Sequence, residues 1–119
     1  MTYTVAFTRR ANAHLLALYH YITQQTTPFT AQRYTTALVS SCRALITFPA
    51  RAPLRPEIFP GLCVAHHRGR TVIAYILDDA RARVVILGLY SGGQDFESDL
   101  LENHNEVAGE LHDALGDRS

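Results

Sequence analysis

Two arginines that flank a glycine, Arg68-Gly69-Arg70, offer the clearest chemistry in this sequence. A guanidinium group is a planar fork that binds phosphate or carboxylate oxygens in pairs. Because Gly69 marks a tight turn, both side chains can reach the same side of it and clamp a phosphate. A solvated hairpin tip is the alternative interpretation of the same three residues.

His66 and His67 stand immediately before this turn and are the obvious groups to carry protons near neutral pH. Neighbouring residues of a strand point to opposite faces of a sheet. We therefore expect one of the two rings to face inward, and we expect no acid–base pair between them.

Other catalytic groupings are missing from the sequence. It has no nucleophile beside a base, no His/Cys spacing for a metal, and no glycine-rich phosphate loop between a strand and a helix. Gly92-Gly93 is predicted to be a turn, and Cys42 and Cys63 are predicted to be small buried thiols. We expect no catalytic residue, no cofactor and no metal, which favours a protein that acts by binding.

Length and composition fit one globular domain, with 119 residues and an apolar content of 47%. No apolar run approaches the roughly 20 residues that cross a bilayer. The N-terminus lacks the basic and apolar segments of a secretory signal, so a cytoplasmic location is expected.

Charge is divided unevenly along the chain. Residues 1–90 hold ten arginines against three acids, whereas residues 91–119 hold one arginine against eight acids, and lysine is absent. A basic body with an acidic tail indicates anionic contacts. A genome that favours arginine codons, together with a solvating tail, is the alternative explanation.

The first half predicts a strand and a helical hairpin. Apolar residues alternate over residues 3–7, the period of a half-buried strand. Thr8 is the expected N-cap of a helix that runs to about Gln25. A second helix is expected to begin at Thr27-Pro28 and to end near Phe48, before a proline. The short connection predicts an antiparallel hairpin.

The second half predicts a meander of three strands. Four prolines make residues 49–60 a stiff loop. Strands follow at about 62–68, 70–77 and 83–90, with turns at Gly69 and at residues 78–80. The last two strands are apolar on both faces, so helices should cover at least one face. Alternation places Tyr90 in the core, on the face of Val84, Ile86 and Gly88.

The acidic tail, residues 98–119, has apolar residues at helical spacing but also carries Gly109. It is a docked helix, a frayed helix or a segment that orders on a partner. The predicted fold is α+β, with an N-terminal strand, an antiparallel helical hairpin and a three-stranded antiparallel meander (β-α-α-β-β-β) plus this tail. Residues 1–97 are expected to form one domain and to pack the hairpin on a mainly antiparallel sheet.

Several collinear landmarks resemble the ParE/RelE superfamily of small bacterial toxins over roughly residues 2–97. They are Tyr3-x-Val5-x-Phe7-Thr8, Phe48-Pro49 before Arg51, Gly61-Leu62, His67-Arg68, Val72-Ile73-Ala74-Tyr75, Val84-x-Ile86 and Gly92-Gly93-Gln94-Asp95. The ending Tyr-x-Gly-Gly-x-Asp-Phe is more similar to the ParE branch than to the RelE branch.

The resemblance implies two different activities. ParE-like members inhibit DNA gyrase and block replication, whereas RelE-like members are endoribonucleases that cut messenger RNA in the ribosome. Both are held inactive by an antitoxin, and the ParD-like antitoxin of the ParE branch usually carries a ribbon-helix-helix DNA-binding end. The expected assembly is therefore a hetero-oligomer with a cognate antitoxin.

Three hypotheses follow. The first is a gyrase-binding toxin without a catalytic centre. The second is a ribosome-dependent endoribonuclease with Arg68 and Arg70 on the phosphate, although Ser91 stands where many ParE-like members have His and the lysines of RelE-like sites are absent. The third is a toxin fold held inactive by its own acidic tail, folded back on the basic body.

Position and charge suggest two contact surfaces. The expected target surface comprises Arg51, Arg55, Arg68, Arg70, Tyr90 and Phe96. The expected anchors for acidic side chains of the antitoxin are Arg9, Arg10 and Arg33.

Overall fold

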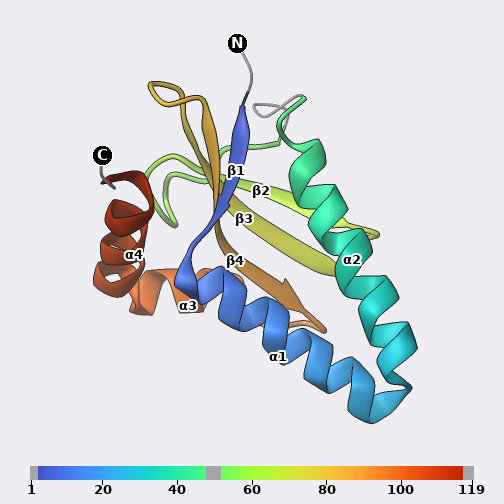
Figure 1. Cartoon of the computed structure of the whole chain (residues 1–119). Coiled ribbons are helices and arrows are strands. Elements are labelled where there is room, and N and C mark those ends of the chain that lie inside the picture. Colours follow the sequence, from blue (N-terminus) through green and yellow to red (C-terminus); the bar gives the residue numbers. More distant parts are fainter. Residues whose placement is uncertain (1–2, 48–51, 117–119) are drawn as a thin grey trace.

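A computed structural model describes residues 3–47 and 52–116 (Figure 1). The elements run in the order β1 (Thr4–Phe7), α1 (Arg9–Gln25), α2 (Pro28–Ala44), β2 (Leu62–His67), β3 (Thr71–Asp78), β4 (Arg83–Ser91), α3 (Phe96–Glu102) and α4 (His104–Gly116). The predicted β-α-α-β-β-β order and the α+β class are confirmed. Within the described residues, no helix has the length and apolar character needed to span a membrane.

The four strands form one sheet in the order β1-β4-β3-β2. β2, β3 and β4 pair antiparallel, as predicted for the meander. β1 pairs parallel with β4, so that Val5 lies opposite Val84 and the sheet is mixed. The helical hairpin is the crossover that brings the chain from β1 to the far edge of the sheet, which leaves β4 free to pair with β1.

The two long helices begin at the predicted residues. Thr8 accepts a hydrogen bond from the backbone N–H of Ala11, and Thr27 accepts one from Thr30, so both threonines are N-caps. The predicted end of α2 near Phe48 is wrong, because the helix ends at Ala44. Residues 45–47 form tighter turns with i to i−3 hydrogen bonds, and Phe48 and Pro49 lie outside the described residues.

The strands and turns of the meander lie close to their predicted positions. Arg68 and Gly69 both adopt positive φ, at 55° and 67°, and the Arg70 N–H donates to the His67 carbonyl at 3.0 Å. Residues 68–70 therefore form a tight turn between His67 and Thr71, which pair across the two strands. The predicted loop before β2 is confirmed over residues 52–61. Its Leu54 forms an isolated bridge with Cys63 and covers the first half of the β2 edge.

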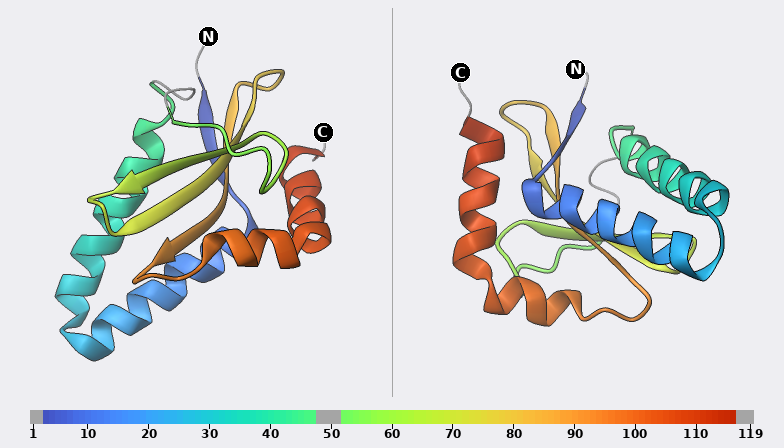
Figure 2. Two further views of the ribbon diagram at one scale, coloured as in Figure 1. Left: turned by 180° about the vertical axis from the view of Figure 1, so that it is seen from behind. Right: turned by 60° about the horizontal axis from the view of Figure 1, so that its bottom comes forward.

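Helices cover both faces of the sheet (Figure 2). One core lies under α1 and α2, and its fully buried members include Leu38, Tyr75 and Ile86. The other lies under residues 58–59 and the C-terminal helices, and its fully buried members include Leu87 and Leu100. The tail is therefore a docked pair of helices, the first of the three alternatives left open by its sequence.

A β-bulge in β4 changes the face on which Tyr90 lies. The register shifts between Ala74, which pairs with Gly88, and Tyr75, which pairs with Ile86, so Leu87 is an extra residue in β4. Tyr90 is buried, as predicted, but it packs with Val85 and Leu87 instead of Val84 and Ile86. The predicted face is wrong because strict alternation does not survive a bulge.

Candidate functional site

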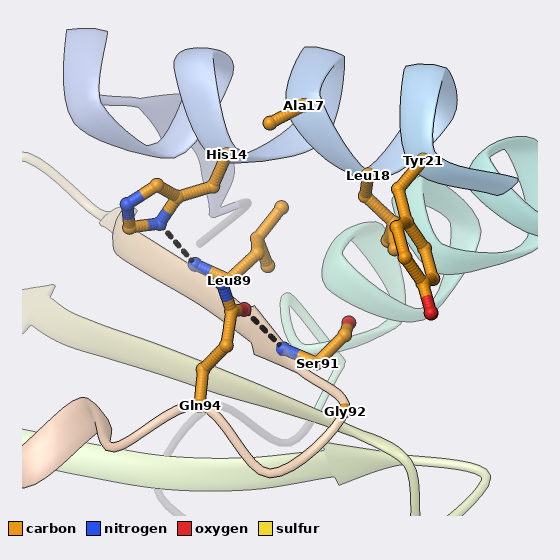
Figure 3. Close-up of a pocket in the computed structure, with 8 residues that line it drawn as sticks. All are labelled: His14, Ala17, Leu18, Tyr21, Leu89, Ser91, Gly92 and Gln94. Carbon is orange, nitrogen blue, oxygen red and sulfur yellow. Dashed lines mark hydrogen bonds between the residues drawn. The ribbon is translucent and has the colours of Figure 1, made fainter. Parts of the chain in front are cut away.

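A cavity of about 420 Å³ lies between α1 and the end of β4. Figure 3 shows its lining, which is His14, Ala17, Leu18 and Tyr21 from α1, and Leu89, Ser91, Gly92 and Gln94 from the strand end and the turn after it. Gln94 fixes this turn, because its side-chain oxygen accepts a hydrogen bond from the Ser91 N–H at 2.7 Å. The cavity is mainly apolar and carries a few polar groups, as ligand sites often do.

His14 is the histidine of the lining. Its Nδ1 accepts a hydrogen bond from the Leu89 N–H at 3.1 Å, so the neutral ring carries its proton on Nε2. The ring also packs edge-on against Tyr90, with centroids 4.9 Å apart. Burial lowers the pKa of His14, and the charge of Arg10 lowers it further against the opposing effect of Asp99. The ring is therefore a neutral hydrogen-bond donor.

A second polar group lies between α2 and the ends of β2, β3 and β4. The Tyr34 and Thr71 hydroxyls are 2.7 Å apart, and Thr71 is in turn 2.7 Å from the Ser91 hydroxyl. His67 Nδ1 lies 2.5 Å from the Ser41 hydroxyl, and its ring meets Tyr34 edge-on at 5.4 Å. Ser91 thus belongs both to the cavity wall and to this internal chain of hydroxyls.

The two histidines before the hairpin turn separate as predicted. His66 is exposed, whereas His67 is 5% exposed and its Nε2 has no hydrogen-bond partner among the described residues. Ser41 and His67 touch, yet within residues 3–47 and 52–116 no carboxylate binds Nε2 to orient the ring as a catalytic base would require. No arginine is among the residues that line the cavity. Among the described side chains, a base, an acid and a phosphate-binding cation therefore do not lie together at one site.

The buried His67 predicts a pH-dependent stability. Burial and the charge of Arg68 lower its pKa, so in the folded state the ring stays neutral while the unfolded ring binds protons. We expect the free energy of unfolding, measured by urea denaturation between pH 8 and 5, to fall as the pH drops below about 6.5.

His67→Gln should flatten part of this dependence, and the remainder should come from His14, whose pKa is also lowered. His66→Gln is the matched control, because this neighbour is exposed on the opposite face. An unchanged slope in His67→Gln would contradict the prediction.

Three of the expected contact arginines share one end of the molecule. Arg68 and Arg70 are exposed on the hairpin turn, and neither forms an ion pair with any residue that the structure describes. Arg33 lies 5.8 Å above the Phe29 ring and precedes Tyr34, which contacts residues on both sides of that turn. We name these three residues the hairpin-end arginines.

The other expected arginines lie elsewhere. Arg55 donates to Glu57 at 2.6 Å and to Glu97 at 3.1 Å. Arg9 and Arg10 pair with acids of the C-terminal helices. Arg51 lies outside the described residues.

Two expected aromatic contacts lie in or against the core. Tyr90 is buried, and its hydroxyl donates to Asp99 at 2.6 Å. Phe96 is half-buried and its ring lies 6.1 Å from that of Tyr90. His14 and Tyr21 are not among the residues predicted from the sequence, although the spacing of His14, Leu18 and Tyr21 is that of one helix face next to the apolar stripe.

Comparisons with known proteins agree on the fold. Residues 5–96 match the family described as the ParE toxin of type II toxin-antitoxin system, parDE. The fold is similar to that of a chain in the solved structure of the chromosomal ParDE TA system from P. aeruginosa, with a TM-score of 0.65 and 20% identity over 76% of this chain and 96% of that chain.

It is also similar to a chain of the toxin-antitoxin complex RelBE2 from Mycobacterium tuberculosis, with a TM-score of 0.57 and 29% identity over 79% of this chain and 95% of that chain. No curated protein matches the sequence. Since the family match covers most of the chain and the four-stranded fold accompanies it, this chain belongs to the ParE toxin family of type II toxin–antitoxin systems.

Proposed function

We propose that this chain is a toxin that inhibits DNA gyrase by binding it and so blocks DNA replication in the cytoplasm. A cognate ribbon-helix-helix antitoxin of the ParD kind neutralises it in a hetero-oligomer. Membership of the ParE toxin family supports the proposal. The first 97 residues form the toxin domain, and residues 98–119 form an added tail, in keeping with a family match that ends at residue 96.

The main support for the proposal is that some of the expected contact arginines pair with acids of the same chain, whereas others do not. Arg9, Arg10 and Arg55 are already neutralised by acids of the same chain. The hairpin-end arginines (Arg33, Arg68 and Arg70) keep their charge available to a partner. An exposed cluster of one sign steers an oppositely charged partner to the surface and fixes its orientation.

Binding is favoured over RNA cleavage by the position of the proton carriers. Cleavage through the 2′-hydroxyl needs a base, an acid and cations around one phosphate. Arg68 and Arg70 are at the surface, but His67 is buried beneath them and its Nδ1 is engaged with Ser41. The hydroxyls of Tyr34 and Thr71 are engaged with each other.

The hairpin-end arginines give a direct test. We expect purified wild-type protein to inhibit supercoiling by gyrase, and Arg68→Glu/Arg70→Glu to inhibit roughly tenfold or more weakly, because two favourable charge contacts become repulsive. Arg43→Glu is the matched control, since Arg43 is exposed in the last turn of α2 and forms no ion pair within the described part of the chain.

Absence of inhibition by wild-type protein would overturn the gyrase target. Cleavage of messenger RNA in a ribosome extract, lost in the same double variant, would establish the endoribonuclease instead.

A further inference from the structure

The cavity beside α1 exists because β1 is shorter than β4. β1 pairs with β4 only as far as Phe7, which lies opposite Ile86, and the chain then turns into α1. The last residues of β4 therefore have a helix as their neighbour on this edge, and between them lies the cavity of about 420 Å³ whose lining Figure 3 shows. A cavity of this size is within the range of small-ligand pockets.

The backbone of β4 at this edge already has its hydrogen bonds. The N–H of Leu89 donates to His14 Nδ1 at 3.1 Å, and the N–H of Ser91 donates to the side-chain oxygen of Gln94 at 2.7 Å. Because a backbone donor shut away from water needs a partner, these two side chains take the place of the missing strand. Neither N–H is free to bind a ligand, so the donors available along this edge are side chains.

The Ser91 hydroxyl is the best-placed of these donors, because it ends the internal chain of three hydroxyls. The Tyr34 and Thr71 oxygens are 2.7 Å apart, and so are those of Thr71 and Ser91. A phenol is more acidic than an alkyl hydroxyl and donates more readily, so Tyr34 donates to Thr71. Thr71 then donates its one proton to Ser91, whose own proton has no acceptor among the described residues. Successive hydrogen bonds polarise one another and strengthen the last donor.

Two side-chain donors stand where the strand end meets the cavity. Figure 3 shows the Ser91 hydroxyl pointing from the strand end toward α1. The Gln94 amide is the second donor: since its oxygen accepts the Ser91 N–H, its nitrogen keeps both N–H groups without a partner in the described part of the chain. The two donors match a carbonyl oxygen, which has two lone pairs and accepts two hydrogen bonds.

The remaining wall is apolar and aromatic. Ala17 and Leu18 of α1 and Leu89 of β4 supply apolar surface. Tyr21 forms an exposed rim, with 61% of its surface accessible, where its ring can cover a flat ligand. None of the lining residues carries a carboxylate or a guanidinium, so a charged ligand would lose water there without gaining a counter-ion. This wall suits a flat, uncharged body.

We propose that this cavity binds an uncharged aromatic compound that carries a carbonyl oxygen, an aromatic amide being the simplest case. The carbonyl oxygen accepts hydrogen bonds from the Ser91 hydroxyl and from the Gln94 amide. The ring lies against Leu18 and Leu89, beside the rim that Tyr21 forms.

The position of the site connects it to the hairpin-end arginines. Thr71 directly follows Arg70, and Tyr34 directly follows Arg33. A ligand on Ser91 therefore contacts the end of a hydrogen-bonded chain whose other members adjoin two of these arginines. The site goes beyond the proposed function, because its ligand is neither gyrase nor an antitoxin.

Benzamide is a probe of this chemistry, and the amide spectrum of isotope-labelled, full-length protein reports where it binds. We expect saturable shifts of the Ser91, Gly92 and Gln94 signals, with a Kd on the order of 1 mM for a ligand of this size. Benzoate has the same shape but carries a charge, and it should bind about tenfold more weakly. No saturable shift of these signals would overturn the site. Equal or tighter binding of benzoate would overturn the uncharged class of ligand.

Two variants separate the cavity wall from the hydroxyl donor. Ala17→Phe fills the cavity and should abolish the shifts, whereas Ala13→Phe, one turn earlier on the same helix and outside the lining, should leave the Kd unchanged. Ser91→Ala should weaken benzamide about tenfold but change the Kd of benzene, which has no carbonyl, by less than about twofold.

Unchanged binding of benzamide to Ala17→Phe would place the ligand elsewhere and overturn the proposal. An equal loss for benzamide and benzene in Ser91→Ala would show that the serine shapes the wall and does not donate. Titration of the wild type needs no variant, so the site stays testable if a variant fails to fold. None of these readouts involves gyrase, so the site and the proposed target stand or fall separately.

Discussion

Arg10→Met should lower the free energy of unfolding by about 3 kcal/mol at pH 7, measured by urea denaturation. The Arg10 side chain is 12% exposed and faces the side chains of Asp99 and Glu110, which are 26% and 14% exposed. Methionine keeps the aliphatic stem but removes the positive charge that both shielded carboxylates contact. Most of the cost comes from Asp99, because Tyr90 and Asn103 keep it in place.

Two variants separate this effect from a general loss of surface charge. Arg9→Met removes the neighbouring, exposed ion pair with Asp113 and should cost about 0.5 kcal/mol or less. Asp99→Asn in the Arg10→Met background should recover about 1 kcal/mol or more, because the shielded negative charge is then gone. Equal destabilisation by Arg9→Met and Arg10→Met would show that the burial of Arg10 does not matter.

Local features of the fold could be predicted because their causes lie within a few residues. A threonine N-cap needs only the backbone N–H three residues ahead, and Thr8 and Thr27 both meet this condition. The hairpin at Gly69 depends on positive φ at two successive residues. Such signals do not depend on the rest of the chain.

Features that depend on distant parts of the chain could not be predicted. Alternation over residues 3–7 identifies a strand but not its neighbour, so the parallel pairing of β1 with β4 was not foreseen. The bulge at Leu87 is invisible in an unbroken apolar run, and it reverses the face of every later residue in β4. The cavity beside His14 arises from the gap between a helix and a strand end that are 75 residues apart.

The uneven division of charge along the sequence correctly predicted anionic contacts for the basic body. It could not predict which acid pairs with which arginine. Anionic contacts for the basic body exist. For Arg9 and Arg10 they are acids of residues 99–113, whereas Arg55 pairs with both Glu57 and Glu97. Only the docking of Leu100 and Val107 decides which acids meet which arginines, since both residues are buried against the sheet. What remains for a partner is therefore the exposed arginines that pair with no acid of the described chain, among them Arg68 and Arg70.

Gly88→Ala should destabilise the protein by about 2 kcal/mol, because even a methyl side chain at this position would overpack the core. A Cβ atom there would lie 2.6 Å from the Tyr90 hydroxyl oxygen and 2.7 Å from the ring carbon Cε2. The ring cannot move aside freely, since it is buried against His14 and its hydroxyl is bound to Asp99. Urea denaturation of the two proteins measures the difference.

The same contact can be isolated by a double-mutant cycle with Tyr90→Leu, which removes the ring that the new methyl group would strike. In the Tyr90→Leu background, Gly88→Ala should cost less than about 0.5 kcal/mol, which gives a coupling energy above about 1 kcal/mol. Additive losses would instead assign the cost to the backbone of the bulge, where glycine is common for conformational reasons. Tyr90 also donates the hydrogen bond that holds Asp99. The lower free energy of unfolding of Gly88→Ala should therefore be accompanied by faster amide exchange in α3. This result would link the bulge in β4 to the anchoring of the tail.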